Sequence, residues 1–184
     1  MKTPSVTSLP LFAVFIFCTV WAVLTVAAPL MVPSDTLVDL SGVVGGHENE
    51  DQFDDLSAIP HAVYWLGDAE CHQLANRSFF LNGNQMPFCA RDVGIFVGVA
   101  VGFGVASFIR YKIHPLIALA GLVPIAIDGG LQAVTSYESN NILRVVTGLI
   151  AGLALSLLIA HFMLVLQEDS RKKRSAGEGK PGQE

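Results

Sequence analysis

Four long runs of apolar residues dominate the chain, and charged residues are largely confined to the segments between them. The runs cover residues 9–32, 93–109, 113–134 and 142–166. A helix crosses the hydrocarbon core of a bilayer with about 20 apolar residues, and only helices or closed barrels satisfy their backbone groups there. Because the runs lack period-two alternation, we predict an all-α membrane bundle with one transmembrane helix in residues 9–32 and three in residues 93–166.

The first run also fits a second interpretation. Lys2, the apolar stretch and the small residues Ala27 and Ala28 are arranged as in a secretory signal peptide, in which residues 1–28 would be removed. The run is longer than the apolar core of about 7–15 residues that is typical of such a peptide. We therefore expect a retained helix that follows a short N-terminal tail, residues 1–8.

Composition and charge support a membrane protein and indicate its orientation. Hydrophobic residues make up 52% of the chain and charged residues 15%, which is too few charges for an ordinary soluble domain. Lys and Arg gather on the cytoplasmic side of membrane proteins, so we place both ends in the cytoplasm. The cytoplasmic set is then Lys2, Arg110, Lys112, residues 171–174 and Lys180, and the outer set is Arg77, Arg91 and Arg144.

This charge pattern predicts the partners and the ends of the chain. We expect a multi-pass protein of the cell membrane that contacts the lipid bilayer, and the basic residues form no nucleic-acid footprint. Residues 167–184 are expected to be a basic, disordered cytoplasmic tail.

The long segment between the first and second runs divides into two parts. Residues 33–59 are acidic and rich in glycine, which predicts a flexible, solvated outer loop. Residues 60–92 are amphipathic and aromatic, which predicts a structured extracytoplasmic loop with a short interfacial helix. Asn82-Gly83 is a turn signal, so residues 79–88 are expected to form a hairpin.

Small residues recur every four positions in the second and fourth runs. Such stripes let helices approach closely in lipid, so we expect these two helices to pack together. The same faces would also serve a homo-oligomer or a membrane partner. The stripes are Gly94, Gly98, Gly102 and Ala106, and Gly148, Gly152, Ser156 and Ala160.

Asp128 is an acid inside the third apolar run. An ionisable group costs about 2.5–3.5 kcal/mol there, so it should face the bundle interior or a cavity. Gln132 lies one helical turn later, and we expect Pro124 and Gly129-Gly130 to break or loosen this helix. Asp128 would bind an ion or small ligand, or would pair structurally with Arg144.

A second polar cluster surrounds the cysteines of the outer loop. Cys71 and Cys89 suggest a disulfide across the hairpin. Alternatively Cys71, His72, Cys89 and Asp92 supply the thiolates, imidazole and carboxylate that suit zinc, and free thiols are the third possibility. Arg77 and Arg91 would either lock the loop onto the bundle by pairing with Asp92, Glu70 or Asp128, or receive an anionic ligand.

These motifs resemble a known family. Cys71-His72-Gln73, Arg77-Ser78-Phe79, Cys89-Ala90-Arg91, Gly94 and Gly98, Pro124, Asp128-Gly129 and Gln132 look like the uncharacterised predicted membrane proteins of domain-of-unknown-function family 2085. Many members have a further cysteine where this chain has Asp92. The resemblance implies a membrane protein with an outward-facing polar site and implies no activity.

Three functions are compatible with this pattern. We favour an outward-facing polar site that binds a metal ion or a small ligand. The alternatives are a small transporter or channel subunit that uses Asp128, and a non-catalytic subunit of a membrane complex. An enzyme is not expected, because Ser78 and His72 are not set in a nucleophile motif.

Overall fold

The computed structural model describes residues 6, 8–109 and 114–178. The basic residues Lys2, Arg110, Lys112 and Lys180, on which the predicted orientation partly rests, lie outside the described residues.

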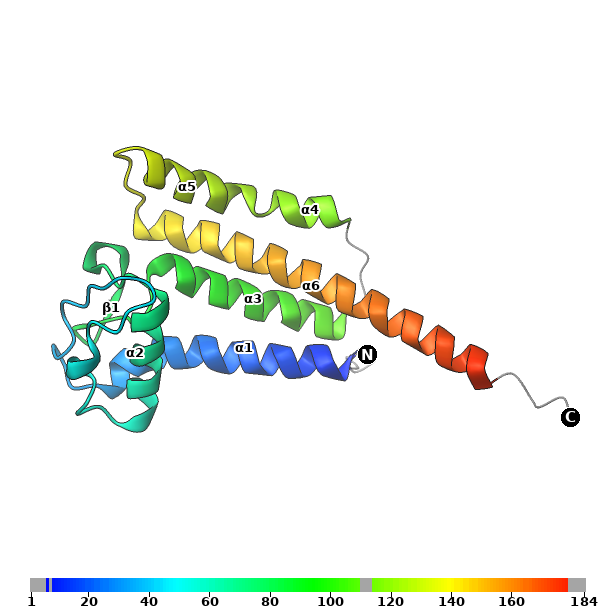
Figure 1. Ribbon diagram of the computed structural model, residues 1–184, viewed down its shortest axis with the longest axis horizontal. Coiled ribbons are helices and arrows are strands. Elements are labelled where there is room, and N and C mark those ends of the chain that lie inside the picture. The colour runs from blue at the N-terminus through cyan, green and yellow to red at the C-terminus, as the bar shows by residue number, and fades with distance from the viewer. Residues whose placement is uncertain (1–5, 7, 110–113, 179–184) are drawn as a thin grey trace, which may run out of the picture.

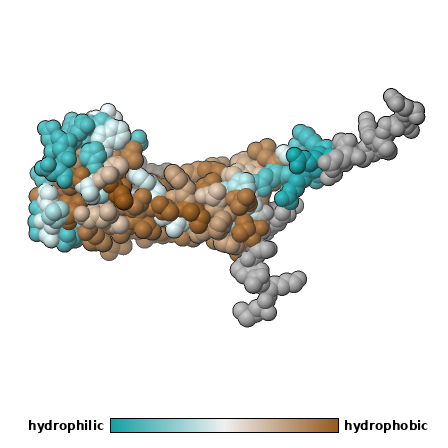
Figure 2. Space-filling view, turned by 90° about the horizontal axis from the view of Figure 1, so that it is seen from below, coloured by the Kyte–Doolittle hydropathy of each residue, from teal (hydrophilic) through white to brown (hydrophobic). Residues whose placement is uncertain are grey.

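Within the described residues, four helical segments are long and apolar enough to cross a membrane: Leu9–Met31, Ala90–Phe108, Pro115–Val134 and Asn141–Arg174. The predicted all-α fold with its membrane-spanning helices is therefore confirmed. Figure 2 shows an apolar band around the middle of the molecule, with hydrophilic residues at both ends of it. Large apolar side chains are exposed along this band, as contact with lipid requires.

The helices are arranged as a row (Figure 1). The central pair is α3 (Ala90–Phe108) and α6 (Asn141–Glu178). Against α3 packs α1 (Leu9–Ala27), and against α6 pack α4 (Pro115–Ala120) and α5 (Val123–Val134).

Glycine residues allow α3 and α6 to approach closely. A Cβ atom on Gly98 would collide with the backbone of Leu149, and one on Gly148 would collide with the backbone of Arg91. The predicted packing of the second and fourth membrane helices is therefore confirmed. The two small-residue stripes contact each other within the chain, and their use by a second copy or another subunit stays a prediction.

The third span consists of two helices rather than one. Gly121 and Leu122 separate α4 from α5, and Pro124 lies in the first turn of α5. Pro124 has no N–H to donate to the carbonyl of Ala120 four residues earlier, and its ring would clash with that carbonyl, which explains why α4 ends at Ala120. The expected loosening at Gly129-Gly130 is wrong, because α5 continues through both glycines.

The fourth span continues well beyond the predicted end at residue 166. α6 extends to Glu178 and projects from the bundle (Figure 1). The prediction of disorder is therefore wrong for residues 167–178. The sequence contains neither proline nor glycine between residues 167 and 176, and Asp169 pairs with Lys173 one turn later at 2.9 Å, which supports a helix.

The chain between α1 and α3 folds into a cap, residues 28–89, over one end of the bundle (Figure 1). Its helix α2 lies across the bundle end. The elements of the cap are η1 (Ala28–Met31), η2 (Glu50–Gln52), α2 (Ala58–Glu70), η3 (Ala75–Arg77), β1 (Phe80–Leu81) and β2 (Asn84–Gln85).

The predicted hairpin is present in the cap. β1 and β2 pair antiparallel, with Phe80 opposite Gln85 and Leu81 opposite Asn84. The two residues between the strands have positive φ values, 54° at Asn82 and 72° at Gly83. A two-residue turn of this kind favours Asn-Gly, because both positions require a left-handed backbone.

The acidic part of the loop, residues 33–59, is packed into the core of the cap. Leu37, Leu40 and Phe53 are fully buried in one apolar core with Tyr64. The side chain of Gln85 accepts from the Leu40 amide and donates to the Leu40 carbonyl, both at 3.1 Å. The prediction that residues 33–59 form a solvated connection is therefore wrong for these positions.

Candidate functional site

Two buried glutamine side chains hold the Cys71 segment against the Cys89 segment. Gln73 Nε2 donates to the carbonyl of Pro87 at 2.8 Å, and Gln85 Nε2 donates to the carbonyl of Gln73. Gln73 has a φ of 45°, a left-handed conformation that is unfavourable for a residue other than glycine. These bonds maintain the turn after Cys71 and place the Cys71 segment beside Cys89.

Cys71, Cys89 and Asp92 form what we call the thiol–carboxylate group. Their two sulfur atoms and a carboxylate oxygen all lie within 4.8 Å of one another. Cys89 Sγ donates to Asp92 Oδ2 at 3.1 Å. Both cysteines are free thiols in the structure, and the disulfide alternative stays a prediction.

The thiols in this group have different acidities. A hydrogen bond to Cys89, together with burial, raises the pKa of the Cys71 thiol. The same hydrogen bond stabilises a thiolate at Cys89 and lowers the pKa of that thiol. Cys89 also directly precedes α3, where the helix dipole favours a thiolate. Cys89 is therefore the first of the pair to ionise.

His72 is separated from the other predicted metal ligands. Its side chain is exposed, and among the described residues the compact set of possible ligand atoms contains Cys71, Cys89 and Asp92 without it. The remaining thiol, Cys18, lies in α1, away from the cap.

Asp128 forms an ion pair with Arg91. The carboxylate is buried, with 4% of the side chain exposed, and its Oδ2 lies 2.5 Å from Arg91 Nη2. The Tyr137 hydroxyl donates to Oδ1 at 3.3 Å. The salt bridge joins Asp128 to Arg91, which is one of the predicted locking pairs, and not to Arg144 as the structural alternative predicted; it ties α5 to α3.

The side chains of Arg77, Arg91 and Arg144, which we call the arginine cluster, converge beside this ion pair. They come from η3 in the cap, the first turn of α3 and the first turn of α6. Glu138 Oε1 lies 3.6 Å from Arg77 Nε and 3.8 Å from Arg144 Nη2. The cap is thus joined to α6 through a carboxylate that two guanidinium groups share.

Gln132 lies among the same guanidinium groups. Its amide oxygen must face donors, which fixes the orientation of the amide. In that orientation the oxygen accepts from Arg77 at 2.9–3.2 Å and from Arg144 at 3.3 Å. In the same orientation the Gln132 amide nitrogen, which is itself a donor, lies 3.4 Å from Arg91 Nη2.

A cavity of about 270 Å³ connects the two groups of side chains. Its wall includes the thiol–carboxylate group, the arginine cluster, Gln132 and His72, whereas Asp128 lies outside this wall. The cavity is therefore a polar chamber between the cap and the bundle, with thiols and a carboxylate together with the guanidinium groups.

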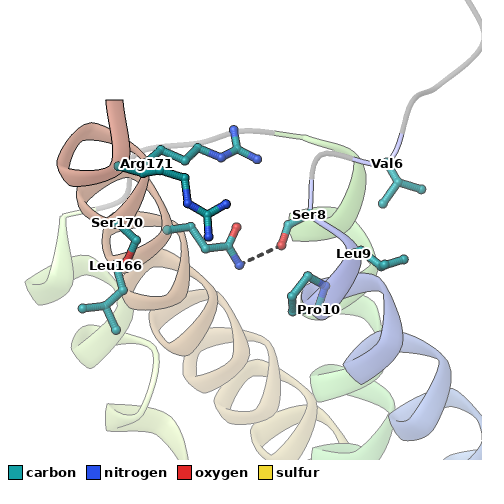
Figure 3. A pocket seen from close by; sticks show the side chains of 9 residues that line it. Val6, Ser8, Leu9, Pro10, Leu166, Ser170 and Arg171 are labelled. Atoms are coloured by element: carbon teal, nitrogen blue, oxygen red, sulfur yellow. Dashed lines mark hydrogen bonds between the residues drawn. The ribbon is translucent and has the colours of Figure 1, made fainter. Parts of the chain in front are cut away.

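A second hollow, of about 660 Å³, lies at the opposite end between the start of α1 and the projecting part of α6 (Figure 3). Gln167 donates to the Ser8 hydroxyl across it at 3.0 Å, and Arg171 lies at its edge. The described residues that line it include no thiol or carboxylate, so the cap chamber is the candidate site.

Sequence reasoning identified most of this chamber but missed two contributors. Arg144 was considered only as a partner for Asp128, and Glu138 was not considered at all. Glu138 lies between α5 and α6, and Arg144 lies in the first turn of α6, so both are far in sequence from the cap. The outer set of arginines in the charge pattern was the signal that pointed to Arg144.

Comparison with known proteins places the chain in a family. A model described as "Predicted membrane protein (DUF2085)" matches residues 71–158, which contain all the chamber residues named above. An uncharacterized protein of Methanocaldococcus jannaschii is 42% identical over 102 residues, 53% of this chain and 64% of that protein. An uncharacterized protein of Methanothermobacter thermautotrophicus is 40% identical over 100 residues, 51% of this chain and 90% of that protein. No solved structure matches. The chain belongs to the predicted membrane protein family DUF2085.

Proposed function

We propose that this membrane protein binds a zinc-type metal ion in the cap chamber through Cys71, Cys89 and Asp92. The proposal rests on one observation: the two sulfur atoms and a carboxylate oxygen all lie within 4.8 Å of one another. Zinc takes thiolate at about 2.3 Å and carboxylate at about 2.0–2.2 Å in a tetrahedron, which sets ligand atoms about 3.3–3.8 Å apart. Small side-chain movements would reach that geometry.

Three protein ligands would leave the fourth position of a tetrahedral ion free. Zinc sites with three protein ligands hold water or substrate in that position. The group lines the cavity, so a molecule in the chamber would have access to the ion. The lowered pKa of Cys89 favours one of the two thiolates, and because the pKa of Cys71 is raised, a metal would have to displace the proton of that thiol on binding.

The transporter alternative has less support. Its proposed acid, Asp128, already accepts hydrogen bonds from Arg91 and Tyr137. The complex-subunit alternative also has less support, because the small-residue stripes pack against each other within the chain.

Elemental analysis of the purified protein, combined with thiol counting after non-reducing denaturation, tests the proposal. We expect stoichiometric zinc that is lost in Cys71→Ser and in Asp92→Asn, with all cysteines titrating as free thiols once the metal is chelated. Cys18→Ser is the matched control and should keep its metal. A protein without metal whose Cys71 and Cys89 are oxidised to a disulfide would overturn the proposal.

A further inference from the structure

The arginine cluster carries more positive charge than its protein partners neutralise. Arg91 has Asp128 as its own partner. Arg77 and Arg144 share Glu138, whose side chain is 53% exposed, at distances longer than the roughly 2.7–2.9 Å of a direct charge-assisted hydrogen bond. Among the described residues, the ion pairs of the cluster therefore set two carboxylates against three guanidinium groups.

In the part of the chain that the structure describes, the two other acids of the chamber, Asp92 and Glu70, form no ion pair with the cluster. Asp92 accepts from Cys89, and Glu70 is exposed at the rim. Arg144, in contrast, is only 2% exposed, so water does little to screen its charge.

The cluster also contains a hydrogen-bond donor that has no acceptor in the described part of the chain. Arg91 Nε is buried and has no hydrogen-bond partner among the described residues. A buried donor without an acceptor is destabilising, so an acceptor placed against this atom would bind favourably. Besides Glu138, Arg77 and Arg144 share the amide oxygen of Gln132. Arg144 also donates to the Asn76 carbonyl and to Asn141 Oδ1. These further acceptors are neutral and supply no charge.

We propose that the arginine cluster and Gln132 bind a small oxyanion. A phosphate, sulfate or carboxylate group offers the acceptor oxygens and the negative charge that the cluster lacks, and it fits guanidinium donors side-on. The cavity of about 270 Å³ limits the ligand to a few heavy atoms or to one headgroup phosphate. This oxyanion site uses residues other than the proposed metal ligands, and it does not require a bound metal.

Calorimetric titration with inorganic phosphate, in neutral detergent without added lipid, tests this site. We expect saturable binding that sodium sulfate competes with and that sodium chloride at equal ionic strength competes with far less. Arg77→Gln should weaken the affinity at least about tenfold through loss of a charge-assisted contact. Lys173→Gln, at an exposed position on the projecting part of α6, is the control and should leave the affinity unchanged.

Two further variants test which side chains the phosphate binds. Arg144→Gln should abolish binding, and if its buried position prevents folding, Arg77→Gln alone decides, because that side chain is 36% exposed. Cys71→Ser should retain phosphate binding, so a failure of the metal proposal is distinguishable from a failure of this one.

The same titration in lipid nanodiscs distinguishes a lipid headgroup from a free oxyanion as the ligand. Loss of phosphate binding when phosphatidic acid replaces part of the phosphatidylcholine would identify a lipid headgroup as the ligand, and unchanged binding would identify a free oxyanion. Absence of saturable phosphate binding in detergent, or equal binding by Arg77→Gln, would overturn the proposal.

Discussion

Asp128 and Arg91 provide the clearest single-residue test of the bundle. Replacing Asp128 with Asn removes the charge that balances Arg91, whose side chain is only 23% exposed. Leaving one partner of a buried ion pair uncompensated costs about 3 kcal/mol or more, somewhat less where the cation keeps contact with water. We expect Asp128→Asn to lower the free energy of unfolding in detergent by about 2–3 kcal/mol, as measured by thermal or denaturant unfolding.

The pair Asp169–Lys173 supplies the control for this experiment. It also pairs an aspartate with a basic side chain, but its side chains are 59% and 78% exposed, and exposed pairs contribute little. Asp169→Asn should leave the unfolding temperature unchanged. Equal stability of the two variants would mean that Arg91 finds another partner and that the ion pair does not hold α5 to α3.

Residue-level chemistry was predictable where a charge stood in an apolar run. Asp128 stands out because an acid there needs a partner, and Arg91 was among the partners considered for it. Glu138 lies in the short segment between α5 and α6, where an acid is ordinary. Its contacts with Arg77 and Arg144 depend on how the cap folds back, which no local pattern encodes.

At the scale of helices, the contact of α3 with α6 makes a specific prediction about glycine. Gly98→Ala should be destabilising by about 1–3 kcal/mol, because the added methyl group would collide with the backbone of Leu149. Gly130→Ala is the matched control: a Cβ there meets nothing within 4 Å, and alanine favours a helix over glycine by up to about 1 kcal/mol. Thermal unfolding of both variants in the same detergent measures the difference. A Gly98→Ala protein as stable as Gly130→Ala would contradict the close packing.

The elements were predictable to the extent that their signals are local. Apolar length located the membrane helices, and Asn82-Gly83 located the hairpin. The core of the cap was missed because Leu37, Leu40 and Phe53 are scattered through a polar segment without helical or strand periodicity. Their burial follows from α2 and the hairpin, which provide the surface on which they pack.

At the scale of the whole molecule, the two polar ends carry different groups of residues. The chamber lies at the end that the cap covers, whereas the projecting part of α6, at the other end (Figure 1), contains the basic residues 171–174. Basic residues next to a membrane helix favour the cytoplasmic side. We therefore expect the cap, with its chamber, to face the non-cytoplasmic side.

Cysteine labelling tests this orientation directly. In a background with the native cysteines replaced by serine, Glu48→Cys lies in the cap and Lys172→Cys lies on the projecting part of α6, and both positions are exposed. A membrane-impermeant maleimide should label Glu48→Cys in intact spheroplasts and should label Lys172→Cys only after permeabilisation, because the charge bias sets the basic segment inside. The reverse pattern would place the chamber in the cytoplasm, where the ligands available to its thiols and arginines would be cytosolic ones.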